Sequence, residues 1–397
     1  MSTDKLPTGW TRMKFGAIAA SITERVDDPS AAGVDRYVGL EHLDPESTTI
    51  RRWGSPSDVE STKLRFYPGD VVYGRRRAYQ RKLGVADFDG ICSAHALVLR
   101  ARPEVCLPEF LPYFLQSDAF HQRALDISVG SLSPTINWKT LAVQEFALPP
   151  IEEQRQIVEV LVSFSRVEGA YGRALNSISS RREAEIGLLA GGSAPGLVPL
   201  RDIAKVTSGE SWSGSDERLE PTPGAVAVVG ISSLKPSGTI EYEHPTYVLG
   251  LGSKPGLVTV DEKCVIVIRT NGNPDRIGNV YLATPSIAGC AVSAFTFCCA
   301  FESREQAELA FEYMSGRAFQ RWATSLVAGS TGLKNLPINQ LRLAMVPSID
   351  TPGSAEVYER LRSLREVARS AAAAGERIAE LARTVRETLM YGGTHVQ

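Results

Sequence analysis

One sequence pattern occurs twice in this chain, and the two copies lie about 200 positions apart. The clearest matching pairs, first copy then second, are Val38-Gly39-Leu40 with Val229-Gly230-Ile231, Val71–Arg75 with Val265–Arg269, and Gly130-Ser131 with Gly329-Ser330. Solenoid repeats are much shorter, at roughly 20 to 50 residues each. The pattern therefore predicts two copies of one domain.

Each copy ends in a long run of apolar residues with heptad spacing. These residues are Ile157, Leu161, Phe164, Tyr171, Leu175, Ile178 and Leu189 in the first run, and Val357, Leu361, Leu364, Ala368, Ala371, Gly375, Ile378, Ala382, Val385 and Leu389 in the second. Sustained spacing of this kind is typical of a coiled-coil seam. We therefore predict two helices of about 36 to 40 residues, roughly 55 to 60 Å long at 1.5 Å per residue.

The heptad runs also predict how the helices pair. An antiparallel pairing places the bulky middle of the first run, Tyr171 and Leu175, opposite the small residues Ala368, Ala371 and Gly375 of the second. Large side chains opposite small ones fill a seam without voids. The alternative is that each helix packs only on its own domain. Charged residues interrupt the first run at Glu168, Arg182 and Glu185.

The composition is that of an ordinary globular protein. A chain of 397 residues suits two or more domains, and its side chains are 43% hydrophobic and 22% charged. With a net charge of −2, a nucleic-acid binder must concentrate its positive charge locally. The six cysteines show no zinc-ligand spacing, and no run of residues resembles a signal peptide or a membrane span. We therefore expect a cytoplasmic protein with reduced thiols, no metal and no membrane contact.

The chain divides into four parts. Residues 1–149 and 193–349 are predicted to form the two domains, and residues 150–192 and 350–397 the two helices. Within the domains, short β-rich runs alternate with glycine and proline turns, which predicts an α+β fold that is mainly sheet. We expect strands near 37–40, 70–73, 96–101, 225–230 and 265–269, helices over 108–125 and 306–324, a loop at 130–135 and a linker at Gly191–Gly196.

The densest positive charge lies between Lys63 and Lys82. Seven cations there face one acid, Asp70, which leaves a net charge of +6. Arginine at the end of a strand suits the binding of phosphates and, in the major groove, of guanine. The alternative is a solvated charged surface. The predicted DNA-binding residues of the first copy are Lys63, Arg65, Arg75, Arg76, Arg77, Tyr79, Arg81 and Lys82.

The second copy has a matching strand, followed by a loop that opens with arginine. Asparagine and arginine on a turn rich in glycine and proline suit the reading of adenine and guanine edges. Asn-Gly and Asn-Pro are equally ordinary turn sequences. The predicted DNA-binding residues of this copy are Arg269, Asn271, Asn273, Arg276 and, further along the chain, Lys334.

Signatures of catalysis are missing from the sequence. It has no phosphate-binding loop, no HExxH zinc motif and no GxSxG nucleophile motif, and its five histidines are scattered. Acidic residues stand near a lysine at 60–63 and 261–263, but neighbours of this kind are too common to predict a nuclease site. We therefore expect neither catalytic residues nor a bound cofactor in this chain.

The junction between the first domain and its helix carries a family resemblance. Ser133–Trp138 reads SPTINW, and Phe146–Val158 reads FALPPIEEQRQIV. Together they closely resemble the passage by which a target-recognition domain enters the first spacer helix in the DNA-specificity subunits of type I restriction-modification systems. The order domain, helix, domain, helix extends the resemblance to nearly the whole chain. The second junction, Ala344–Ser348, lacks the Glu-Gln pair.

The resemblance implies a non-catalytic subunit whose two target-recognition domains read the two halves of a split DNA site. Two antiparallel coiled-coil helices would separate the domains with pseudo-twofold symmetry, matching the half-sites. Two DNA methyltransferase subunits would dock at the helices, through residues that include Glu153, Gln154 and Arg155, and would supply S-adenosylmethionine chemistry on adenine. Motor-nuclease restriction subunits, which use ATP and Mg, would join for cleavage.

Two other functions are compatible with the sequence. The chain could serve as the specificity subunit of a methylation-only or other phage-defence complex. It could also be a coiled-coil scaffold whose duplicated domains bind protein, although the basic cluster between Lys63 and Lys82 argues against this function. DNA binding that weakens steeply with salt would separate the scaffold from the specificity subunit.

Overall fold

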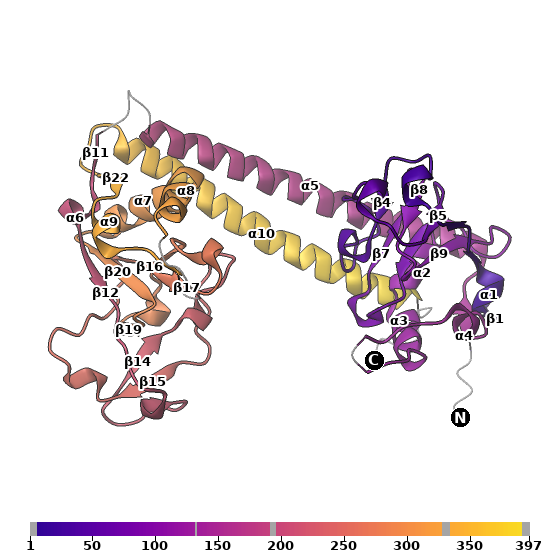
Figure 1. The fold of residues 1–397 in the computed structure, drawn as a ribbon, viewed down its shortest axis with the longest axis horizontal. Helices are drawn as coiled ribbons and strands as arrows, with labels where there is room; N and C mark the ends of the chain where they lie inside the picture. The colour runs from indigo at the N-terminus through magenta and orange to yellow at the C-terminus, as the bar shows by residue number, and fades with distance from the viewer. Residues whose placement is uncertain (1–5, 132, 191–195, 328–333, 391–397) are drawn as a thin grey trace. The chain divides into compact units, whose positions relative to one another are not determined.

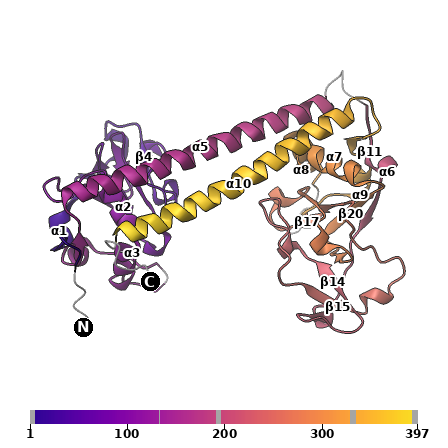
Figure 2. The same cartoon turned by 180° about the vertical axis from the view of Figure 1, so that it is seen from behind.

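The computed structural model describes residues 6–131, 133–190, 196–327 and 334–390. These residues form two compact units. The first contains the described residues up to Gly172 and those from Ala373 onward, and the second contains those between Arg173 and Ala372. Each unit combines sheets with helices (Figure 1 and Figure 2). The predicted α+β class is confirmed.

Two four-stranded sheets form the body of the first unit. Its strands are β1 (Thr11–Lys14), β2 (Ala19–Ile22), β3 (Arg25–Val26), β4 (Tyr37–Val38), β5 (Lys63–Phe66), β6 (Val71–Gly74), β7 (Leu83–Val85), β8 (Gly90–Cys92), β9 (Ala96–Ala101) and β10 (Glu145–Leu148). The main sheet is antiparallel and has the order β2-β9-β6-β7. The second sheet has the order β3-β5-β8-β4, with β4 and β8 parallel. Strands β1 and β10 pair separately as a ribbon.

The second unit repeats the main sheet strand for strand. Its strands are β11 (Leu197–Pro199), β12 (Ala204–Ser208), β13 (Glu217–Arg218), β14 (Ala225–Val229), β15 (Thr246–Leu249), β16 (Cys264–Ile268), β17 (Thr270–Asn271), β18 (Val280–Leu282), β19 (Ala291–Val292), β20 (Thr296–Phe301), β21 (Lys334–Asn335) and β22 (Met345–Pro347). The order β12-β20-β16-β18 matches β2-β9-β6-β7. The second sheet, β13-β15-β14-β19, keeps one parallel pair. The predicted duplication is therefore a duplication of structure.

Alternate residues of the inner strands face two different cores. In β6, Val71 and Tyr73 pack with the helices of the unit, whereas Val72 packs into a core shared with the second sheet. Strand β16 alternates in the same way between two cores. Because successive side chains of a strand point to opposite faces, a strand covered on both faces is apolar throughout. This arrangement explains the continuous apolar runs of these strands.

The helices predicted over 108–125 and 306–324 are each a pair of helices in the structure. The short helices of the two units are α1 (Phe15–Ile18), α2 (Leu111–Gln116), α3 (Asp118–Asp126), α4 (Trp138–Ala142), α6 (Leu200–Ile203), α7 (Arg304–Met314), α8 (Arg317–Ser325) and α9 (Ile338–Arg342). Ser117 is extended, at ψ 151°, and its side chain caps α3 by accepting from the amide of Phe120. Gly316, also extended at ψ 156°, is the N-cap of α8 but makes no side-chain hydrogen bond. The prediction of single helices was wrong because an N-cap can begin a new helix inside an apolar pattern.

Two long helices complete the fold. Helix α5 (Ile151–Ala190) has 40 residues and α10 (Ser354–Met390) has 37. The predicted heptad residues are their buried and half-buried positions, and most residues between them are exposed. No helix in the described ranges is long and apolar enough to cross a membrane.

Both units use the ends of both long helices in their cores. Ile157 and Leu161, near the start of α5, share the core of the first unit with Met390, at the end of α10. In the second unit, Leu189, at the end of α5, shares a core with Leu361, near the start of α10. Within each unit the two helices therefore run antiparallel, as predicted. The alternative, that each helix packs only on its own domain, is wrong.

Two of the charged residues that interrupt the first heptad run form ion pairs within the second unit. Arg182 Nε lies 2.5 Å from a carboxylate oxygen of Glu312 on α7, and Arg360 Nε on α10 lies 2.9 Å from Glu185. Glu312 is only 1% exposed, and Arg365 of α10 lies 3.4 Å from its other oxygen. Removing one partner of a buried pair leaves an uncompensated charge. These pairs hold α5, α7 and α10 together in that unit.

Some predicted segments lie outside the described residues. They are the linker from Gly191 up to residue 195, the Gly329-Ser330 dipeptide, and the part of the second helix segment beyond Met390.

The seam between the helices can be tested at Gly375. A Cβ atom on Gly375 would lie 3.9 Å from Tyr171 Cβ, which is ordinary van der Waals contact. Replacing Gly375 with alanine should therefore raise the free energy of unfolding by up to about 1 kcal/mol, the difference in helix propensity. Thermal unfolding followed by circular dichroism measures this change.

Gly172→Ala is the matched control, because the position is helical and nothing lies within 4 Å of its added Cβ. Gly375→Leu should instead lower the midpoint temperature, because the larger side chain must displace Tyr171. If the leucine and alanine variants are equally stable, the helices are not closely packed at this point.

Candidate nucleic-acid interface

The arginines that follow β6 are paired with a loop far away in the chain. Arg77 N donates to Pro134 O at 2.8 Å, and Ile136 N donates to Arg75 O at 3.0 Å. The loop at 130–135, which carries part of the family resemblance, is thus joined to the basic cluster. Sequence reasoning identified both segments but not their pairing.

The second unit contains the same ladder. Leu336 N donates to Arg269 O at 2.9 Å, and β17 pairs with β21, with Asn271 opposite Lys334. We call each ladder, together with the turn that follows its first strand, the reading edge of its unit. The first reading edge consists of residues 75–82 and 133–136, and the second of residues 269–276 and 334–336.

The first reading edge presents its cations outward at only some positions. Arg76 and Arg77 are exposed, and Tyr79 is 53% exposed. Arg76 Nε donates to Ser133 Oγ at 3.0 Å, so a residue of the distant loop orients this guanidinium. Arg75 is half-buried, and its Nε has no hydrogen-bond partner among the described residues. The outward cations are suited to contact phosphates.

The turn that carries Tyr79 has an unusual backbone. Arg77 (φ 57°) and Arg81 (φ 48°) are left-handed and flank the 3-10 turn Ala78–Gln80, and Glu46 (φ 57°) donates from its amide to Arg81 O. Among the described residues, these are the non-glycine residues with positive φ. A left-handed backbone is costly for side chains that have a Cβ, and it often accompanies functional loops.

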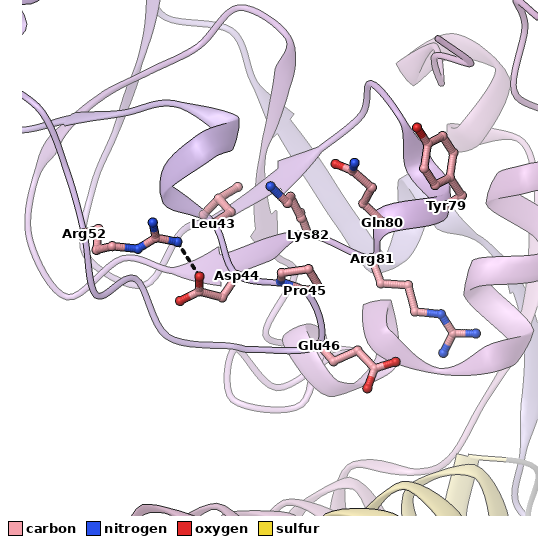
Figure 3. A pocket seen from close by; sticks show the side chains of 9 residues that line it. All are labelled: Leu43, Asp44, Pro45, Glu46, Arg52, Tyr79, Gln80, Arg81 and Lys82. Carbon is pink, nitrogen blue, oxygen red and sulfur yellow. Dashed lines mark hydrogen bonds and ion pairs between the residues drawn. The ribbon is translucent and has the colours of Figure 1, made fainter. Parts of the chain in front are cut away.

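An open cavity of about 550 Å³ lies beside this turn (Figure 3). Figure 3 shows Gln80 and Lys82 pointing to one side of the turn and Arg81 to the other. On the facing loop, Asp44 pairs with Arg52. The residues that line the cavity are Leu43, Asp44, Pro45, Glu46, Arg52, Tyr79, Gln80, Arg81 and Lys82.

Four of the predicted DNA-binding cations are engaged inside the first unit. Lys63 is only 4% exposed and donates to Ser61 Oγ at 2.8 Å, and burial lowers the pKa of its ammonium group. The other three are Arg65, which lies 2.6 Å from Asp89, Arg81, which lies 2.5 Å from Asp118, and Lys82, which donates to Leu40 O at 3.0 Å. The net charge of +6 therefore overstates the charge offered to a ligand, because the pairing acids lie elsewhere in the sequence.

The predicted residues of the second unit also make internal contacts. Arg269 Nε donates to Asn335 Oδ1 at 2.9 Å, and Arg276 donates to Leu234 O. The side-chain oxygens of Asn271 and Asn273 each accept from a backbone amide two residues on, as in an ordinary Asx turn. Lys334 is exposed. The asparagines therefore shape the loop through these oxygens.

Of the predicted partner-binding residues at the first junction, Gln154 needs a correction. Gln154 is fully buried, and its amide donates to Val105 O at 2.8 Å and Pro149 O at 2.9 Å while accepting from Leu107 N at 2.9 Å. It fastens the start of α5 to the first unit and does not face a partner. Glu153 accepts from the indole of Trp10 at 3.0 Å. Arg155 is exposed and pairs with Glu152.

The second junction has an equivalent clamp that comes from another element. Gln306 of α7 donates to Pro347 O at 2.9 Å and accepts from Ile349 N at 2.7 Å. The missing Glu-Gln pair is thus compensated by a glutamine about forty positions earlier in the chain. Sequence reasoning missed this residue because it searched only the junction.

Sequence reasoning also missed a duplicated turn beside the reading edges. The turn reads Ser93-Ala94-His95 before β9 and Ser293-Ala294-Phe295 before β20. Both His95 and Phe295 are exposed. Extending the repeat alignment by one further segment would have identified them. Within the described ranges, no three His, Cys, Asp or Glu side chains are placed to hold a metal ion.

Comparisons with known proteins agree on one family. Residues 54–171 match the family described as the type I restriction modification DNA specificity domain. The type I restriction enzyme EcoDI specificity subunit of Escherichia coli is 30% identical over 160 residues, which cover 38% of this chain. The match spans about a third of that relative, 34% of its length.

Solved structures share the fold over almost the full chain. The S subunit of a type I restriction-modification system from M. genitalium aligns with a TM-score of 0.55 and 14% identity, over 97% of each chain. A chain from a structure described as the basis of complex assembly and conformational transition of the type I R-M system aligns with a TM-score of 0.60 and 17% identity, over 98% of this chain and 99% of that one. At these identities the likeness establishes the fold.

The role of Gln154 can be tested by substitution. Gln154→Ala should lower the free energy of unfolding by about 2 to 5 kcal/mol, because it leaves the buried Pro149 carbonyl and the half-buried Val105 carbonyl and Leu107 amide without their partner. Urea denaturation measures the loss. Gln156→Ala, exposed on the same helix, is the control and should change stability by less than about 0.5 kcal/mol. Equal, small effects at both positions would contradict the clamp.

Proposed function

We propose that this chain, whose residues 54–171 belong to the type I restriction-modification DNA specificity domain family, is the sequence-reading subunit of such a system. Its ligand is double-stranded DNA with two separate half-sites. The observation that carries the proposal is the duplicated reading edge, which offers Arg76 and Arg77 to solvent in the first unit and Lys334 in the second. Cations at such an edge bind phosphates and position the protein, while neighbouring side chains read bases.

The two reading edges share a backbone but differ in chemistry, which suits half-sites of different sequence. Solvent-facing side chains make the DNA contacts in this proposal. They are Arg76, Arg77 and Tyr79 in the first unit and Asn273 and Lys334 in the second. Of the remaining predicted residues, Lys63 and Arg65 make contacts elsewhere in the first unit. The others support the edges: Arg75, Arg81, Lys82, Arg269, Asn271 and Arg276.

The proposed subunit is non-catalytic and acts with partners. Target-recognition domains at 1–149 and 193–349 read DNA, and spacer helices at 150–192 and 350–397 bind the partners. The partners supply the chemistry: methyltransferase subunits with S-adenosylmethionine, and restriction subunits with ATP and Mg. A methylation-only complex would use the same chain. The cysteines are all free thiols, which suits a reducing cytoplasm.

A second apolar stripe on the long helices supports the docking of partner helices. It lies next to the heptad seam at a seven-residue spacing, as Val160, Val167, Ala174 and Leu188 on α5, where Arg181 interrupts it, and as Val367, Ala374 and Leu381 on α10. The valines and leucines among them are 41% to 56% exposed. Two-stranded coiled coils usually carry charged residues beside the seam. Apolar residues there widen the stripe to the width that a larger helical bundle needs.

The repetition of this stripe supports two copies of one partner. Val167 and Ala174 on α5 match Val367 and Ala374 on α10, 200 residues later, whereas Arg360, Thr388 and Arg181 stand opposite Val160, Leu188 and Leu381 in the repeat. The matched positions give both copies a similar apolar centre, and similar surfaces on a duplicated chain bind similar partners. We therefore propose one methyltransferase subunit for each copy of the stripe.

DNA binding is tested first at the reading edge. The double variant Arg76→Ala, Arg77→Ala should weaken binding at least tenfold, and each lost phosphate contact should lower the slope of log affinity against log salt by about one. Fluorescence anisotropy over a series of salt concentrations measures both. Arg12→Ala, on the exposed ribbon strand β1, is the matched control. An affinity and slope equal to wild type would contradict the proposal and favour the scaffold function.

Partner docking is tested at the apolar stripe. Val160→Glu with Val167→Glu should abolish co-purification with the methyltransferase subunit, because burying a carboxylate among apolar helices is costly. DNA binding and thermal stability should stay unchanged, since both valines are exposed. Ser163→Glu, also exposed on α5, is the control and should leave co-purification intact. Retained co-purification of the double variant would exclude the stripe as the docking surface.

A further inference from the structure

The two units place a ring at the same turn and differ in which ring it is. Ser93-Ala94 is followed by His95 in the first unit, and Ser293-Ala294 by Phe295 in the second. The repeat keeps the two residues that form the turn and changes the one that it presents. A different side chain at the same position of a repeated turn suits the reading of two half-sites that differ in sequence.

The turn holds Phe295 directly against the second reading edge. Phe295 O accepts from Arg269 N at 2.8 Å and from Thr270 N at 3.2 Å, so its backbone joins the end of β16 to the start of β17. Buried Thr296 fixes the turn from the other side, because its Oγ1 donates to Ser293 O at 2.8 Å. The backbone position from which the ring projects is therefore set by backbone and buried side-chain bonds.

The Phe295 ring faces solvent, although Phe297, two residues further on in β20, does not. Phe297 is fully buried, whereas Phe295 is 48% exposed. Exposed Lys334 belongs to the strand that pairs with β17 of the same reading edge. The ring thus projects from a turn bonded to the edge that we propose contacts DNA, and the same edge carries an exposed cation suited to phosphate.

The chemistry of the ring restricts what it can recognise. A phenyl ring neither donates nor accepts hydrogen bonds, and in the major groove the apolar feature of a base edge is the 5-methyl group of thymine. We propose that Phe295 is a specificity-determining residue that contacts a thymine methyl in the half-site read by the second unit. This inference rests on the proposed function, namely that the chain reads DNA.

The test removes the methyl group and leaves base pairing unchanged. The full-length chain first selects its site from random duplex DNA. Thymines of the selected site are then replaced one at a time by deoxyuridine, and affinities are compared at one salt concentration. Wild type should lose about fourfold in affinity at one thymine of one half-site, the loss expected for one methyl group.

Three variants assign that loss. In Phe295→Ala the thymine and deoxyuridine duplexes should bind equally, whereas Phe295→Leu, which keeps an apolar side chain, should retain most of the discrimination. His95→Ala should retain it fully, because it alters the other unit. Thermal unfolding should be close to wild type for all three, since both positions are exposed turn residues.

Other results overturn the inference. The first is a deoxyuridine penalty that persists in Phe295→Ala. The second is an equal loss of affinity of Phe295→Ala for the thymine and deoxyuridine duplexes, as an inserted wedge would cause. The third is a second half-site without thymine. Failure of the wild-type chain to select any sequence would overturn the proposed function, and the inference with it. Selection of a split site without the Phe295 effect would overturn the inference alone.

Discussion

Neither unit closes its hydrophobic core without the long helices. Leu189 and Leu361 are fully buried in the second unit, and Ile157, Leu161 and Met390 are nearly so in the first. Burial of each such side chain contributes about 1.5 to 3 kcal/mol. The compact units accordingly divide within the helices, after Gly172 and after Ala372. A domain cut at the helix boundary would expose an apolar face, so the helices belong to the cores as much as to any spacer.

Buried amides secure these junctions, and the two units place them differently. In each unit the strand before the junction ends at a proline or just before one, and the carbonyl of this proline is buried and needs a donor. Gln154 supplies the donor to Pro149 from the helix, and Gln306 supplies it to Pro347 from α7. Both units need a donor at this carbonyl, but the donor comes from non-equivalent positions in the two copies. The backbone geometry therefore requires a donor at each proline carbonyl, and a glutamine from a different element supplies it in each unit.

In the reading edges, by contrast, the supporting bonds are repeated and the exposed side chains differ. Their backbone ladders and their braces are repeated, since Lys82 donates to Leu40 O and Arg276 to Leu234 O at corresponding loops. Their outward side chains have diverged. A stiff repeated frame with variable side chains allows a new half-site to be read without a change in the fold, because exposed substitutions cost little stability.

The sequence by itself determined the duplication, the two long helices and the residues of their seam, because helix periodicity is a local property of the chain. It also located the basic cluster, but it could not assign a role to each cation. Lys63 and Arg76 belong to one run, yet Lys63 is buried beside Ser61 and Arg76 reaches solvent beside Ser133. Likewise Gln154 is buried and Gln156 is exposed, two positions apart on one helix. Only the tertiary structure decided these roles, because they depend on partners such as Asp118 for Arg81 and Glu312 for Arg182, which lie 37 and 130 positions away. Charge can be read from the chain one residue at a time, but burial and pairing arise only when distant segments pack.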